Sequence, residues 1–138
     1  MTVGYSGTPL ARKLGIGAGQ QVAVLGPAPR QATDVHALLD PLPDGASLDG
    51  SPDTAAVTLL FVLDRTDLEA RVPELGRAIF PDRTLWVCWP KKASKVSTDI
   101  TEDVIREVVL PLGLVDVKVC AVSEVWSGLK VVWRKDRR

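Results

Sequence analysis

The apolar run Val22–Leu25, which ends in Gly26 and is followed by two prolines, constrains this chain more than any other segment. In α/β domains that bind nucleotides, the first strand is buried and ends in a glycine that begins the nucleotide-binding loop. Several glycines in that loop let the backbone approach a phosphate. Here Pro27 and Pro29 follow Gly26 instead. Proline has no N–H and holds φ at about −65°. We therefore expect a loop that has lost donors which an anionic cofactor needs.

Strand-like and helix-like segments alternate along the rest of the chain. Residues 55–63 form a continuous apolar run, which is typical of a strand buried on both faces of a parallel sheet. Residues 84–89 are the next predicted strand. Residues 115–122 and 129–133 are joined by a short loop, which favours an antiparallel hairpin. This order predicts a three-layer α/β sandwich with a mostly parallel sheet that ends in an antiparallel hairpin.

Helices are predicted between these strands from their capping residues and their apolar periodicity. Thr66 and Glu69 match a capping box, and Pro73 should kink or split the helix that follows. Asp99 with Glu102 is the predicted cap of the next helix. The predicted helices cover residues 10–14, 31–39, 66–80 and 99–112.

The composition is that of an ordinary globular domain, with 17 basic and 17 acidic residues that cancel. With no net charge and no apolar run near the ~20 residues that span a bilayer, we expect neither nucleic acid nor a membrane as partner. Cys88 and Cys120 lie in apolar strand-like runs, so we expect buried free thiols in a reducing cytoplasm. One domain is predicted over residues 1–138, with residues 1–20 as an N-terminal helical extension and residues 134–138 as a basic tail.

The alternating elements, and the last helix that leads into a hairpin, resemble a trimmed class I methyltransferase with a Rossmann-like fold. The resemblance implies S-adenosylmethionine as cofactor, a glycine-rich loop after the first strand, and an acidic residue at the end of the second. This chain lacks the glycine-rich loop, and Asp49, beside a short edge strand near residues 46–48, is the candidate for the acid. We therefore expect no cofactor, and no binding of S-adenosylmethionine in its usual pose.

Several longer segments resemble a family of small bacterial proteins, the domain of unknown function 3052. The resemblance carries no activity with it. The similar segments are residues 5–16, 85–92, 98–102, 113–122 and 126–130.

Candidate ligand-binding residues gather where the strands of the predicted parallel sheet end, because ligands bind at that edge. Lysines and hydroxyls leave the strand over residues 84–89 just before a helix begins, and this combination suits an anion. A solvated basic loop would have the same sequence. Trp126, in the hairpin loop, would either close one side of the site or plug the vacant cofactor crevice. The candidate set is Gly26, Arg30, Lys91, Lys92, Ser94 and Trp126.

Three functions remain open from the sequence. The first is a non-enzymatic binding or regulatory module for an anionic small molecule. The second is a small-molecule methyltransferase with an unusual cofactor loop, and the third is a scaffold for a protein partner or a homodimer. No catalytic residue or metal site is predicted, because His36, the single histidine, has no nucleophile or carboxylate at a useful spacing.

Overall fold

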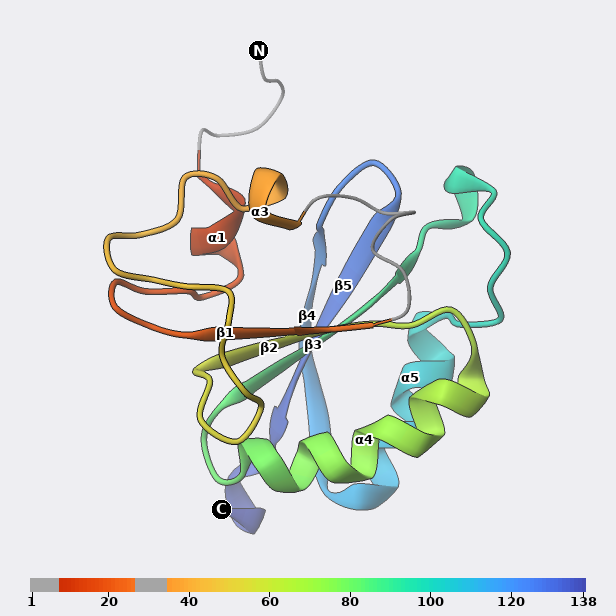
Figure 1. The fold of residues 1–138 in the computed structure, drawn as a ribbon. Helices are drawn as coiled ribbons and strands as arrows, with labels where there is room; N and C mark the ends of the chain where they lie inside the picture. Colours follow the sequence, from red (N-terminus) through yellow and green to blue (C-terminus); the bar gives the residue numbers. More distant parts are fainter. Residues whose placement is uncertain (1–7, 27–34) are drawn as a thin grey trace.

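Five strands are formed by the residues that the computed structural model describes, 8–26 and 35–138. They are β1 (Val22–Leu25), β2 (Val57–Phe61), β3 (Thr84–Pro90), β4 (Leu114–Ala121) and β5 (Trp126–Trp133). They make one sheet in the order β1-β2-β3-β5-β4 (Figure 1). β1, β2 and β3 run parallel, and β5 is antiparallel to both β3 and β4. The predicted mostly parallel sheet with a terminal antiparallel hairpin is confirmed.

Helices cover both faces of this sheet (Figure 1). The longer helices α4 (Arg65–Ile79) and α5 (Glu102–Val109) lie on one face, and the short helices α1 (Leu10–Lys13) and α3 (Val35–Leu38) lie on the other. The predicted three-layer sandwich is therefore confirmed. Within the described residues, no helix has the length and apolar character that crossing a membrane requires. Short 3-10 turns also occur at η1 (Lys92–Ser94), η2 (Leu110–Leu112) and η3 (Lys135–Arg137).

The sheet separates two hydrophobic cores, and β3 contributes to both. Leu85 and Val87 pack into the core under α4 and α5, whereas Trp86 and Cys88 pack into the core on the α1 side. All four side chains are fully buried. Because side chains alternate along a strand, a central parallel strand must be apolar at every position, and each buried side chain stabilises the fold by roughly 1.5–3 kcal/mol.

Helix α4 begins one residue earlier than predicted and is not split. Its N-cap is Asp64, whose carboxylate accepts a hydrogen bond from the Asp67 N–H at 2.8 Å, so the predicted Thr66 capping box is wrong. Pro73 lies inside the continuous helix. The hydrogen bond that proline cannot donate is offset by the apolar face that α4 lays on the sheet. The buried residues of this face are Leu68, Val72, Leu75, Gly76 and Ile79.

Helix α5 is capped by Thr101 and not by Asp99. The Thr101 hydroxyl accepts from the Val104 N–H at 3.1 Å. The Asp99 carboxylate instead accepts from the backbone N–H of Arg65 at 2.8 Å, in the first turn of α4. First-turn N–H groups have no partner within their own helix. Asp99 therefore joins the starts of α4 and α5 at the carboxyl edge of the sheet.

Candidate functional site

A cleft of about 530 Å³ opens at the carboxyl end of β3, beside the start of α5. Trp89 and Ile100 give it an apolar side. Its polar lining residues are Lys92, Thr98, Thr101, Glu102, Asp103 and Arg106. It therefore lies at the edge where the sequence predicted a ligand site. Its volume falls in the range of small-molecule sites.

The segment that leaves β3 is held in place by its own backbone and by Ser94. The Ser94 hydroxyl donates to the Lys91 carbonyl at 2.7 Å and accepts from the Val96 N–H at 3.2 Å. Lys95 then adopts a left-handed backbone conformation, with φ at 64°. The hydroxyl of Ser94, predicted to contact a ligand, is thus occupied in shaping the loop. The Lys91 N–H donates to the Val125 carbonyl at 2.7 Å, which ties this loop to the hairpin.

The three lysines of this loop carry positive charge that no described carboxylate neutralises. Lys91, Lys92 and Lys95 form no ion pair with any residue in 8–26 or 35–138. Lys92 and Lys95 are exposed, and Lys91 is half-buried. Of the three, Lys92 lines the cleft.

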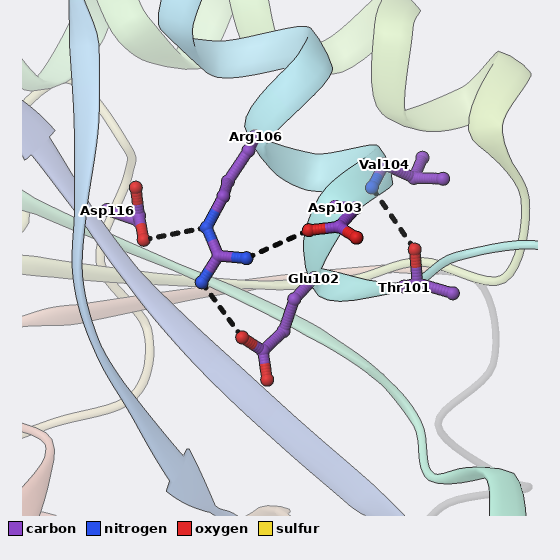
Figure 2. Close-up of polar contacts among 6 residues, drawn as sticks. All are labelled: Thr101, Glu102, Asp103, Val104, Arg106 and Asp116. Atoms are coloured by element: carbon purple, nitrogen blue, oxygen red, sulfur yellow. Dashed lines mark hydrogen bonds and ion pairs between the residues drawn. The ribbon is translucent and has the colours of Figure 1, made fainter.

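The carboxylates beside the cleft are bound by one arginine (Figure 2). The Arg106 guanidinium lies 2.9 Å from Glu102, 3.0 Å from Asp103 and 3.0 Å from Asp116. Hydrogen bonds to Asp116 and Glu102 raise the pKa of Arg106 above its ordinary value, so it stays charged. Glu102 and Asp103 precede Arg106 by four and three residues, a spacing that predicts helical ion pairs. The sequence analysis overlooked this signal, and no local pattern identifies Asp116.

The two threonines of the cleft differ in what they can still donate. The Thr98 hydroxyl donates to the Leu63 carbonyl at 2.6 Å and accepts from the Ile100 N–H at 3.0 Å. The Thr101 hydroxyl only accepts within the described part of the chain, from Val104. Its hydrogen therefore remains available to a ligand acceptor in the cleft.

Trp126 lies on the opposite face of the sheet from Lys92. It is 2% exposed and packs edge-to-face on Phe61, with ring centroids 5.0 Å apart and planes at 86°. It belongs to the core on the α1 side, whereas Trp89 of the cleft belongs to the core under α5. Its indole N–H is buried and has no hydrogen-bond partner among residues 8–26 and 35–138. The structure therefore gives Trp126 a packing position and does not bring it together with Lys92.

Gly26 is packed tightly against β2. Its φ is 147°, and a Cβ at this position would lie 2.7 Å from both the Cβ and the carbonyl oxygen of Phe61. Only glycine accommodates that conformation and that approach. Arg30, Pro27 and Pro29 lie outside the described residues, as do residues 31–34 of the predicted helix over residues 31–39. The described remainder of that helix contains α3.

The candidate acid, Asp49, lies at the wrong end of β1 to serve a ligand near Gly26. The N–H of the next residue, Gly50, donates to the Val22 carbonyl at 3.0 Å, so Asp49 is level with the start of the strand. Gly26 lies four residue steps beyond Val22, a span of about 13 Å along the strand. The expected edge segment is present as a single parallel bridge between Gln21 and Ser47. Asp49 therefore does not lie where the resemblance places the acidic residue.

Both cysteines are free thiols, as predicted, but only Cys88 is buried; Cys120 is half-buried, so the predicted burial is wrong for that residue. Burial raises the pKa of Cys88, and the neighbouring Cys120 raises it further. Burial also raises the pKa of Cys120, although the charges of Lys13 and Lys118 oppose the shift. A thiol with a raised pKa is a poor nucleophile. Within the described residues, no group of three or more metal-binding side chains comes together.

The chain was also compared with known proteins. It matches no family model and no curated protein. Among solved structures it is similar to the magnesium protoporphyrin IX methyltransferase ChlM from Synechocystis PCC 6803, solved with bound S-adenosylmethionine. The TM-score is 0.53 at 12% sequence identity, over 91% of this chain and 74% of that one. The fold is methyltransferase-like. At this identity the likeness concerns the fold alone, and the resemblance to the domain of unknown function 3052 stays a prediction.

Proposed function

We propose that this protein is a non-enzymatic module that binds an anionic small molecule in the cleft at the carboxyl end of β3. The observation that carries the proposal is the charge around the cleft. Lys91, Lys92 and Lys95 have no carboxylate partner among the described residues, whereas Glu102 and Asp103 are already bound by Arg106. Arg106 offsets the charge of only one of the three carboxylates that it binds. An anion would therefore bind on the Lys92 side of the cleft, where it meets an ammonium without a carboxylate partner among the described residues.

The donors that would bind the anion come from two segments. Lys92 offers its ammonium from the loop after β3, and Thr101 offers its hydroxyl from the start of α5. The partial positive charge at the start of α5 adds to their effect. Trp89 and Ile100 supply an apolar surface for the rest of the ligand. Hydrogen bonds of this charge-assisted kind are about twice as strong as neutral ones.

The preference for a binding role over catalysis rests on the side chains near the cleft. The described residues around it include no nucleophile paired with a base, and both thiols have raised pKa values. Arg106 holds its carboxylates in ion pairs, which suits a fixed wall better than a proton-transfer group.

The test is a thermal-shift screen of phosphate, nucleotides and small carboxylates, followed by calorimetry of any anion that stabilises the protein. Lys91→Ala with Lys92→Ala should weaken its binding by about 1–3 kcal/mol in total and hardly change fold stability. The matched control is Lys118→Ala with Lys130→Ala. These two lysines face the α1 side of the sheet, since Lys118 pairs with Lys130, which pairs with Trp86. The proposal fails if no anion binds, or if the control loses as much affinity.

A methyltransferase remains the second candidate, favoured by the likeness to a structure solved with S-adenosylmethionine. Calorimetry with S-adenosylmethionine separates the two. We expect no saturable binding, because Asp49 lies far from Gly26 and Phe61 lies against Gly26. Micromolar binding that survives the double lysine variant would favour the methyltransferase.

A further inference from the structure

We infer that a second hollow, between α1 and residues 41–43, binds a small apolar carboxylate. The hollow measures about 360 Å³. One wall includes Ala11, Arg12 and Ile16, and the other is the Pro41-Leu42-Pro43 segment. The hollow shares no lining residue with the cleft beside Lys92. The inference is therefore independent of the proposed function.

The surface inside this hollow is apolar and short of hydrogen-bond donors. Ala11 and Ile16 are 1% and 3% exposed, so little of either side chain remains accessible. Prolines 9, 41 and 43 also line it, and a proline has no N–H. A ligand body that enters this hollow therefore has to be apolar, because a polar one would lose its hydrogen bonds to water.

Both walls are held by backbone hydrogen bonds. On the first wall, the Ile16 N–H donates to the Ala11 carbonyl at 3.0 Å. The segments that follow the two walls are tied together by the Gly19 N–H, which donates to the Asp44 carbonyl at 2.8 Å. The hollow is therefore formed before a ligand arrives, which lowers the entropic cost of binding.

Arg12 supplies the one charged side chain among the described residues that line the hollow. It is exposed and forms no ion pair or side-chain hydrogen bond with a described residue. Arg65 and Arg106, by contrast, each bind two or more carboxylates. A guanidinium beside an apolar hollow matches a ligand with an apolar body and a carboxylate head, which arginine binds in bidentate fashion.

Phenylacetate and its uncharged analogue phenylacetamide are the matched probes, and amide shifts in ¹⁵N-labelled full-length protein are the readout. We expect phenylacetate to shift the amides of Ala11, Arg12, Ile16 and Leu42 saturably. Phenylacetamide should bind more weakly. Arg12→Gln should weaken phenylacetate binding by about tenfold, the effect of one charge-assisted hydrogen bond, and should leave phenylacetamide unchanged.

Arg134→Gln is the matched control, because Arg134 is exposed and pairs with Asp136 at the C-terminal end of the chain. It should bind both probes as the wild type does. The inference is overturned if the shifts are absent, or if they appear at Thr98 and Thr101 instead. It is also overturned if the amides of the hollow shift with protein concentration alone, since a second copy of the chain would then be its occupant.

Discussion

The indole N–H groups of Trp86, Trp133 and Trp126 differ in their hydrogen-bond partners. The Trp86 N–H donates to the Leu14 carbonyl at 3.0 Å, and the Trp133 N–H donates to the Gly76 carbonyl at 2.8 Å. The Trp126 N–H has no acceptor in the described part of the chain. A buried donor without a partner costs free energy, so Trp126 contributes through its apolar area and its contact with Phe61.

This difference predicts the outcome of replacing each tryptophan by phenylalanine. Trp86→Phe should destabilise the fold by about 1–3 kcal/mol beyond the loss of packing, because the buried Leu14 carbonyl would lose its donor. Trp126→Phe removes no hydrogen bond and should cost distinctly less. Urea denaturation of both variants measures the difference. Equal losses would mean that the Trp126 N–H has a partner beyond the described residues.

At the scale of whole elements, the start of α4 is capped by Asp64 and Asp99, and the sequence predicted neither of them as a cap of this helix. Asp64→Ala should cost about 1 kcal/mol of folding free energy, the usual value for an N-cap. Asp99→Ala should cost a similar amount, although Asp99 lies 34 residues further along the chain, because it accepts from the Arg65 N–H. Asp99→Asn keeps an acceptor and should recover most of the loss. Thr66→Ala is the control and should stay within about 0.5 kcal/mol of the wild type. A larger loss at Thr66 would contradict the assignment of the cap.

The same helix explains which elements the sequence could and could not predict. The apolar run of β3 was readable, because a central parallel strand is apolar at every position. The start of α4 could not be predicted from the sequence, because Asp64 and Thr66 are both residue types that cap helices well. The contact between Asp99 and Arg65 forms only in the folded chain. The sequence predicted correctly that Lys92 lies at the carboxyl edge of the sheet, because Lys92 follows the end of β3. The face of the sheet on which Trp126 lies is set by the pairing of Trp126 with Pro90. That face could not be predicted, because the predicted strand began only at residue 129.

For the molecule as a whole, the exposed edge of the sheet decides whether it meets other copies of itself. β4 is one of the two edge strands of the sheet, and its Val117 and Val119 are 52% and 47% exposed. An open edge with apolar side chains invites strand pairing between molecules. The register shift between Asp116 and Lys118, and the charge of Lys118, both oppose such pairing.

Lys118→Val should therefore increase self-association, because it removes the charge between two exposed valines and leaves the edge apolar. Sedimentation velocity over a range of protein concentrations would show larger species for this variant than for the wild type. Lys130→Val is the matched control, since it removes the same charge from β5, whose two edges are already paired with β3 and β4. It should sediment as the wild type does. If Lys118→Val also sediments as the wild type does, the register shift alone protects the edge, and Lys118 has no part in keeping the molecules apart.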